Sequence, residues 1–151
     1  MTIYLVQHGQ CLDKKIDPDR KLSAEGLATT IQVAEIAANA KIALSTIYHS
    51  GKLRTRQTAE LFSEYLETAK IESIDGLSPL DNVKDFADHF QFSDKTMIVG
   101  HLPFMERLTS YLITGDQEPT VVMFQNSAIV CLDQDENKHW ALKWTIMPVL
   151  N

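Results

Sequence analysis

The sequence has few cysteines, no long apolar run and no excess of basic residues, and each shortage excludes a class of protein. Two cysteines in 151 residues, with no CxxC pair, are too few for a disulfide scaffold, so we expect reduced thiols and a cytoplasmic location. No apolar segment approaches the roughly 20 residues of a membrane span, and the apolar N-terminus lacks the basic start of a signal peptide. With 14 Lys and Arg against 20 Asp and Glu, the net charge of −6 disfavours nucleic acid and anionic membranes as partners.

The rest of the composition is that of an ordinary globular protein. Hydrophobic residues make up 44% and charged residues 23% of the chain, which argues against disorder. No repeat, linker or low-complexity tract interrupts the sequence. We therefore expect a single domain spanning residues 1–151, and we expect it to be a monomer.

Short apolar runs alternate along the chain with segments of helical periodicity. The runs predict strands at 3–6, 42–48, 70–74 and 96–99, and the periodic segments predict helices at 24–39, 53–66, 83–90 and 104–112. In the first helix Ser23 suits the N-cap, Leu27 the apolar face and Asn39 the C-terminal cap. Segments 127–132 and 140–147 predict a hairpin around an acidic stretch, 133–137, which we interpret as a solvated turn rather than a metal loop. This alternation predicts an α/β fold with a mostly parallel sheet.

Polar residues that suit catalysis follow three of the predicted strands. Gln7-His8-Gly9 follows the first, His49-Ser50-Gly51 the second and Gly100-His101 the fourth. Ligands in open α/β sheets bind beyond the carboxyl ends of the strands, so these segments are expected at one edge. A lone histidine is more often structural, but two that each neighbour a glycine at matching strand ends favour a site. His49 either faces this crevice or lies at the surface.

Two arginines suit an anionic ligand at the same edge. Arg54 opens the helix that follows the second strand, where backbone N–H groups favour anions and a guanidinium matches phosphate. An exposed helix face that happens to be basic is the alternative. Arg20 precedes the first helix and is placed either in this crevice or as a solvated loop residue.

Taken together, these segments resemble the histidine phosphatase superfamily, whose phosphoglycerate mutase-like fold is a three-layer α/β/α sandwich. Within it, the short length and the segments around Arg20 and His101 are similar to the SixA-type phosphohistidine phosphatases. Four motifs carry the resemblance, in order: Gln7-His8-Gly9, Arg20-x-Leu22-Ser23-x-x-Gly26, Leu53-Arg54-x-x-Gln57-Thr58 and Val99-Gly100-His101-Leu102-Pro103.

The resemblance implies a role for each matching residue. His8 would be the nucleophile and form a transient phosphohistidine, while Arg20 and Arg54 would hold the phosphoryl oxygens. His101 would be a further donor, and Gly9 would let the backbone approach the phosphoryl group. Neither a metal nor an organic cofactor is implied, because the arginines supply the charge stabilisation.

The first motif departs from the family pattern, which has Arg-His-Gly where this chain has Gln7-His8-Gly9. Gln7 keeps hydrogen-bond donors for the phosphoryl group but loses the cation. A hydrogen bond to a charged group contributes about 1.5–3 kcal/mol against about 0.5–1.5 kcal/mol for a neutral one. The change is therefore expected to slow the chemical step about tenfold, and at most about a hundredfold.

The general acid of related phosphomonoesterases has one candidate here, Asp81, which equally suits the N-cap of the following helix. An imidazole has a pKa of about 6.5 and is therefore a better leaving group than an alcohol. A site without an evident general acid thus points to a phosphohistidine substrate.

We therefore expect a metal-independent phosphohistidine phosphatase that acts on a phosphorylated protein and releases inorganic phosphate. A histidine phosphotransfer domain or a histidine kinase would be the partner. A small-molecule phosphomonoesterase of the same superfamily is one alternative. The other is a phosphate-binding module of low or no activity, which the glutamine at position 7 motivates.

Overall fold

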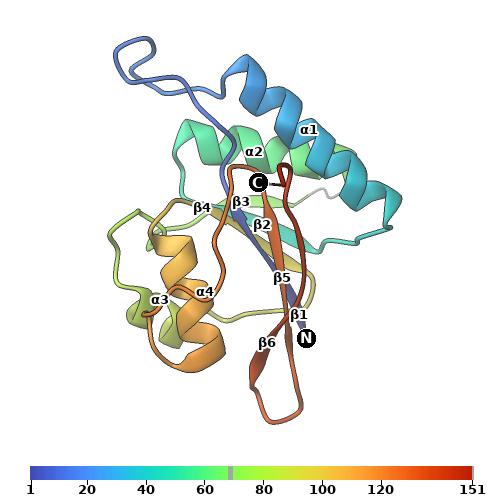
Figure 1. Cartoon of the computed structure of the whole chain (residues 1–151), viewed down its shortest axis with the longest axis vertical. Coiled ribbons are helices and arrows are strands. Elements are labelled where there is room, and N and C mark those ends of the chain that lie inside the picture. The colour runs from blue at the N-terminus through green and yellow to red at the C-terminus, as the bar shows by residue number, and fades with distance from the viewer. Residues whose placement is uncertain (68–69, 151) are drawn as a thin grey trace.

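Six strands form one mixed sheet in a computed structural model that describes residues 1–67 and 70–150 (Figure 1). The strand order across the sheet is β3-β2-β4-β1-β5-β6. The first four strands in this order run parallel, and β5 and β6 add an antiparallel hairpin. The strands are β1 (Thr2–Gln7), β2 (Thr46–His49), β3 (Ile71–Ser73), β4 (Thr96–Gly100), β5 (Ile129–Gln134) and β6 (Trp140–Ile146). The predicted mostly parallel α/β fold is confirmed.

The register of the parallel strands brings the polar segments of the sequence together. Gln7 pairs with Gly100 across β1 and β4, so His8 and His101 are the first residues beyond two adjacent strands. His49 pairs with Val99 across β2 and β4, which places Ser50 beside the same strand ends. Three neighbouring strands thus deliver His8, Ser50 and His101 to one short stretch of the sheet edge.

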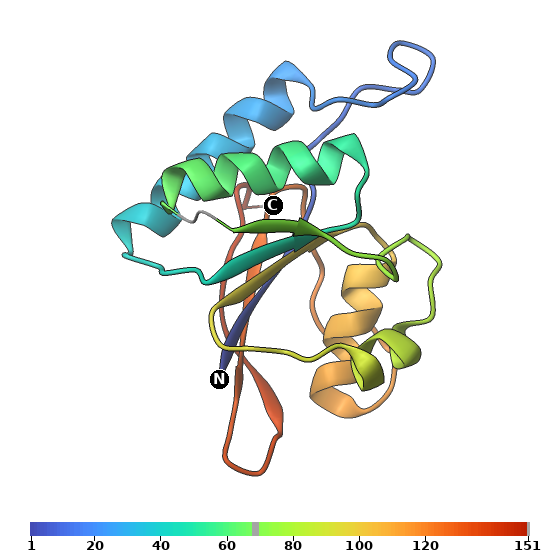
Figure 2. The same ribbon diagram turned by 180° about the vertical axis from the view of Figure 1, so that it is seen from behind.

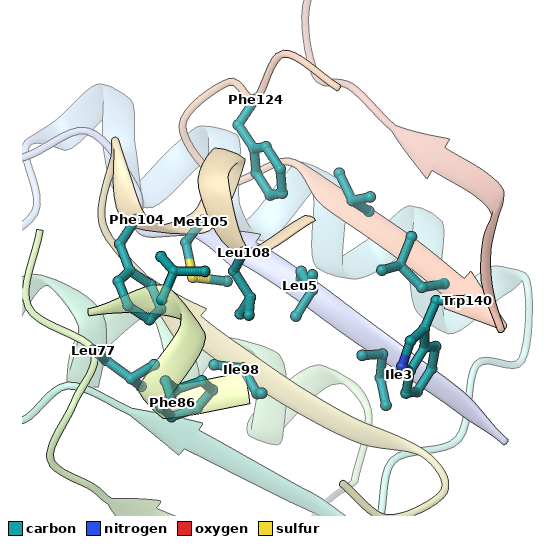
Figure 3. Close-up of a cluster of buried hydrophobic side chains, with 13 residues drawn as sticks. Ile3, Leu5, Leu77, Phe86, Ile98, Phe104, Met105, Leu108, Phe124 and Trp140 are labelled. Carbon is teal, nitrogen blue, oxygen red and sulfur yellow. The ribbon is translucent and has the colours of Figure 1, made fainter. Parts of the chain in front are cut away.

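Two pairs of helices cover the two faces of the sheet (Figure 2). Helices α1 (Ala24–Asn39) and α2 (Leu53–Tyr65) pack on one face, where Phe62 and Val33 meet Val6 and Val99. Helices α3 (Val83–His89) and α4 (Phe104–Thr114) pack on the other. Figure 3 shows this second core, in which aromatic and aliphatic side chains from α3 and α4 lie against Leu5 and Ile98. None of the helices in the described part of the chain is long and apolar enough to cross a membrane.

The structure corrects three local predictions. Ser23 caps α1 as expected, but Leu27 is 40% exposed, and the buried stripe instead includes Thr30 and Val33. The helix ends at a cap formed by Ala40 rather than Asn39. The second strand begins at Thr46, since residues 42–45 lie outside the strand ladder. Ile42 and Leu44 pack against the core there, whereas Ala43 and Ser45 are exposed.

The connection from β1 to α1 is a projecting loop with an ordered base (Figure 1). Cys11 and Leu22 form an antiparallel bridge, and the Leu12 N–H donates to the Lys21 carbonyl at 2.9 Å. We call these paired segments, residues 11–12 and 21–22, the neck of the loop. Beneath the neck, α1 packs so closely that a Cβ atom on Gly26 would lie 1.9 Å from the Gln10 carbonyl oxygen.

Candidate active site

His8 is held in one orientation by its own strand end. Its Nδ1 lies 2.7 Å from the Gly9 carbonyl oxygen, which can only accept, so Nδ1 carries the ring proton. In the neutral imidazole Nε2 then has a free lone pair. Burial, together with the charges of Arg54 and Arg20, lowers the pKa of His8 to about 4 against the opposing effect of the Gly9 hydrogen bond. At neutral pH the ring is therefore uncharged and nucleophilic at Nε2.

The backbone around His8 is fixed by side chains from two distant segments. The Gly9 N–H donates to Thr58 Oγ1 at 2.9 Å, and the same hydroxyl donates to the Arg54 carbonyl at 2.7 Å. Asn126 Nδ2 donates to the His8 carbonyl at 2.9 Å. Both polar groups of Gly9 are thus engaged in orienting His8, and its missing side chain leaves room for Thr30, whose Oγ1 would lie 2.7 Å from an added Cβ.

Arg54 and Arg20 approach the two histidines from α2 and from the projecting loop. Both cations act electrostatically on His8 and on His101, and each lies within range of the other. Arg54 Nε is buried without a hydrogen-bond partner among the described residues, and desolvation lowers the pKa of its guanidinium. Arg20 has a positive φ of 53°, and its Nε donates to the Leu12 carbonyl at 3.3 Å, which ties the guanidinium to the neck.

His101 lies beside His8, with ring centroids 5.1 Å apart in an edge-on arrangement. Only 2% of its surface is exposed. Burial, together with the positive charges of Arg54, Lys52 and Arg20 and the neighbouring ring of His8, lowers the pKa of His101 to about 3. Its Nε2 lies 2.7 Å from Ser50 Oγ, whereas Nδ1 is buried and finds no partner in the described structure.

Three buried polar atoms of the site lack a hydrogen-bond partner among the described residues. They are Gln7 Oε1, Arg54 Nε and His101 Nδ1, one from each of three motifs. Buried polar groups are normally paired, because leaving one unpaired costs about 1–3 kcal/mol. All three belong to residues that gather at the ends of β1 and β4 and the start of α2. Such unmet hydrogen-bonding capacity at one place is typical of a polar ligand site.

A hollow of about 580 Å³ opens beside these residues and is lined mainly by cations. We call it the basic pocket; Arg20 and Arg54 line it together with Lys14, Lys52 and Arg56. Asp19 is the single carboxylate in its wall. A protein of net charge −6 therefore carries a local positive field next to the candidate nucleophile.

The remaining sequence candidates lie outside this arrangement. His49 is buried, and its Nδ1 accepts from the Gly51 N–H at 3.0 Å, so it shapes the turn before α2. Asp81 lines a separate hollow with Asp75 and Asp85, and its carboxylate accepts from the Ser78 N–H at 2.8 Å. It is not the cap of α3, because Asn82 fills that position. Among residues 1–67 and 70–150, no three His, Cys, Asp or Glu side chains could together hold a metal ion.

Sequence reasoning overlooked the hydroxyl and amide groups that orient the site. Thr58 holds Gly9, Gln57 Oε1 accepts from the Leu22 N–H at 2.8 Å, and Ser50 contacts His101. Gln57 and Thr58 belong to the same sequence motif as Arg54, and this motif could have identified them as site residues. Ser50 offered no signal except its place beside a strand end.

Comparisons with known proteins identify the family of the chain. Residues 3–84 match the family model of the histidine phosphatase superfamily (branch 1), which is more than half of the chain, and the protein belongs to this family. A comparison with curated protein sequences gave no match.

Solved structures extend the similarity over the whole chain. The structure of the protein histidine phosphatase SixA complexed with tungstate is similar at 25% identity and a TM-score of 0.86, covering 98% of this chain and 97% of that one. A putative SixA from Agrobacterium tumefaciens aligns at 24% identity and a TM-score of 0.80, with 97% of each chain covered. A putative alpha-ribazole-5'-P phosphatase from Escherichia coli aligns at 15% identity and a TM-score of 0.77, covering 100% of this chain and 99% of that one. The last two show the fold alone.

Proposed function

We propose that this protein hydrolyses phosphohistidine on a protein, by way of a phosphoryl group carried transiently on His8. One observation carries the proposal. The Nδ1–H of His8 is committed to the Gly9 carbonyl, so the lone pair of Nε2 is free beside two arginines. A neutral imidazole fixed in this tautomer is prepared for attack on an electrophilic phosphorus, and cations beside it match the charge on the phosphoryl oxygens.

The reaction proceeds in two displacements. Nε2 of His8 attacks phosphorus, and the P–N bond to the substrate imidazole breaks with its electron pair on the departing nitrogen. The balancing proton sits on the distal nitrogen of the departing ring, so neutral imidazole leaves. The positive charge that forms on the phosphorylated His8 ring is met by the Gly9 carbonyl at Nδ1. Water then attacks phosphorus, the Nε2–P bond breaks, and phosphate leaves with His8 restored.

The choice of phosphohistidine rests on the leaving group and on the basic pocket. Asp81, the acid suggested by the sequence, lies in a different hollow and is engaged by the Ser78 N–H. A departing imidazole needs no such acid, because its own distal nitrogen, with a pKa of about 6.5, can already carry the proton that makes the leaving group neutral. Lys14, Lys52 and Arg56 extend the positive charge beyond Arg20 and Arg54 and suit an acidic protein surface around the phosphoryl group. The related SixA structure contains tungstate, an oxyanion like phosphate.

Two other functions remain as alternatives to this proposal. A small-molecule phosphomonoesterase would need a proton donor for its alcohol, and Asp81 is the residue to test for it. A binding module without turnover is suggested by Gln7, which supplies an amide where the family pattern has a cation. The two unpaired thiols, Cys11 and Cys131, suit a reducing compartment, and we propose that the protein acts in the cytoplasm.

The test is phosphate release from a histidine-phosphorylated phosphotransfer domain in excess chelator, with an aryl phosphate measured beside it. We expect turnover of the phosphohistidine that survives chelator and is lost in His8→Ala. His89→Ala is the matched control, since His89 is an exposed histidine on α3. Preference for the aryl phosphate would favour the phosphomonoesterase. Binding of the phosphorylated domain without turnover would favour the binding module.

A further inference from the structure

We propose that Ser50 is a positioning residue that holds His101 in its Nε2–H tautomer, so that His101 takes up a proton at Nδ1 when the phosphoryl group binds. This inference rests on the proposed function for its ligand, but the tautomer is a property of the free protein. The Ser50 hydroxyl lies 2.7 Å from His101 Nε2, and the direction of this hydrogen bond decides which His101 nitrogen is protonated.

A chain of hydroxyl groups sets the direction of this hydrogen bond. Thr55 Oγ1 lies 2.7 Å from the Lys52 carbonyl oxygen. Because a carbonyl can only accept, the Thr55 hydroxyl donates its one hydrogen to this oxygen. Ser50 Oγ lies 3.0 Å from Thr55 Oγ1 and must therefore donate to it. With its own proton used, Ser50 can only accept from His101. The reverse direction would leave two oxygens 2.7 Å apart with no hydrogen between them.

The Nε2 atom of His101 is consequently the protonated one, and Nδ1 of the neutral ring carries a lone pair. That lone pair is buried and has no partner in the described residues. The Lys52 N–H, at 3.4 Å from Ser50 Oγ, adds a second donor to the serine and favours the same direction. Thr55 is fully buried at the first turn of α2, so the chain is held by the protein interior rather than by solvent.

A lone pair at Nδ1 has a consequence for an incoming phosphoryl group. Dianionic oxygen against an imidazole lone pair is repulsive, whereas a protonated Nδ1 donates a charged hydrogen bond. The charged groups that act on His101 are Arg54 and Lys52 from the start of α2 and Arg20 from the projecting loop, and the titratable ring of His8 just beyond β1 acts in the same direction when it is protonated. They keep the ring neutral until an anion offsets them. His101 thus becomes the donor that the resemblance implies only after it has gained a proton.

The first experiment observes the tautomer directly. Long-range ¹H–¹⁵N correlations in protein carrying ¹⁵N-labelled histidine distinguish the two ring nitrogens, and His101→Gln assigns the signal. We expect Nε2–H for His101 at pH 7, and a shift towards Nδ1–H in Ser50→Ala and in Thr55→Val, which breaks the chain one step further away. Ser93→Ala is the control, because it removes a similar Ser–Thr hydroxyl contact of 2.8 Å at the opposite end of β4. An Nδ1–H signal in the unmodified protein overturns the proposal.

The second experiment measures proton uptake with inorganic phosphate as the probe. If one proton is taken up, the Kd for phosphate rises about tenfold per pH unit between pH 7.5 and 9. We expect a shallower slope in Ser50→Ala and Thr55→Val, because their His101 can present Nδ1–H without gaining a proton. Slopes equal in all three proteins contradict the inference. If phosphate does not bind at all, the proposed function fails, while the tautomer of the free protein still decides the role of Ser50.

Discussion

At the scale of single residues, the site depends on which nitrogen of each histidine carries a proton. The Gly9 carbonyl fixes Nδ1–H on His8, and that contact joins neighbouring residues at a strand end. Sequence motifs identified His8 and His101, yet they carried no information on ring orientation. The orientation comes from Ser50, Thr55 and Thr58, whose contacts span from 3 to 51 positions along the chain.

Gln7 offers the most direct test of the departure from the family pattern. Gln7→Arg places a cation at the end of β1, where Gln7 pairs with Gly100 and its Oε1 is buried without a partner among the described residues. We expect the rate of phosphohistidine hydrolysis to rise about tenfold, because a charged hydrogen bond replaces a neutral one. Gln10→Arg adds the same charge at an exposed position and should leave the rate within about twofold of the unmodified protein. An unchanged rate in Gln7→Arg would show that position 7 does not touch the phosphoryl group.

At the scale of elements, α2 does more than present Arg54. Thr58 on its buried face bonds the Gly9 N–H, and Gln57 bonds the Leu22 N–H in the neck. One turn of α2 therefore positions both the backbone beside His8, the candidate nucleophile, and the loop that carries Arg20. The sequence predicted α2 almost to its ends, because its apolar spacing is regular. It did not predict these two bonds, since a threonine and a glutamine in a helix are compatible with many surroundings.

Thr58→Val tests this coupling at nearly constant volume. The change leaves the buried Gly9 N–H unpaired, so we expect a loss of about 1–3 kcal/mol in the free energy of unfolding, with a fall in activity. Thr109→Val is the matched control, because Thr109 is equally buried and its hydroxyl bonds the Met105 carbonyl of its own helix rather than a distant segment. Urea unfolding at pH 7 should give a clearly lower free energy of unfolding for Thr58→Val than for Thr109→Val. Equal losses of unfolding free energy in the two variants would mean that the hydrogen bond from Gly9 to Thr58 does not contribute to stability.

The packing of α1 under the neck gives a second prediction at this scale. Gly26→Ala would place a Cβ 1.9 Å from the Gln10 carbonyl oxygen, which is backbone and has little freedom to move. We expect a destabilisation of about 3 kcal/mol or more, above the usual range for overpacking, together with loss of activity as the neck shifts. Gly115→Ala is the comparison: its Cβ would meet nothing within 4 Å, and only its φ of 83° resists the change. Gly26→Ala should lower the unfolding midpoint more than Gly115→Ala does.

At the scale of the whole molecule, the sequence predicted the layered α/β architecture because strand and helix periodicities alternate clearly. Its errors fell where burial occurs without regular pairing. Ile42 and Leu44 pack against the core but lie outside the strand ladder, and the buried face of α1 uses Thr30 in place of Leu27. Hydrophobic spacing predicts neither feature, because both depend on which side chains of the neighbouring elements pack against these residues.

Burial of the two site histidines predicts how the stability of the whole fold depends on pH. The folded pKa values of His8, about 4, and His101, about 3, lie below the unfolded value of 6.5. As pH falls below 6.5 the unfolded chain binds protons that the folded chain does not, so the free energy of unfolding decreases. The decrease amounts to at most about 2 kcal/mol per histidine between pH 7 and 5. Burial also lowers the pKa of His49, so His49 likewise contributes to the decrease in stability as the pH falls.

Urea unfolding at pH 7 and pH 5 measures this dependence. We expect the difference between the two pH values to shrink in His101→Gln and to stay unchanged in His89→Gln, an exposed site. The aspartates whose pKa is lowered, such as Asp17, ionise below this range and do not contribute to the difference. A protein equally stable at both pH values would contradict the assignment of neutral, buried imidazoles.

The neck of the projecting loop separates a fixed base, which carries Arg20, from an exposed tip. Arg20 is anchored to Leu12, and the Cys11–Leu22 bridge closes the base. Asp17 belongs to this fixed part, because its carbonyl accepts from the Arg20 N–H at 3.0 Å and its carboxylate accepts from the Lys21 N–H at 2.9 Å. The exposed tip is the short segment from Lys14 to Ile16. Substitutions at the tip can therefore accumulate without displacing the guanidinium. Under the proposed function, changes at the tip would alter which protein surface the loop meets, while the position of Arg20 beside His8 stays the same.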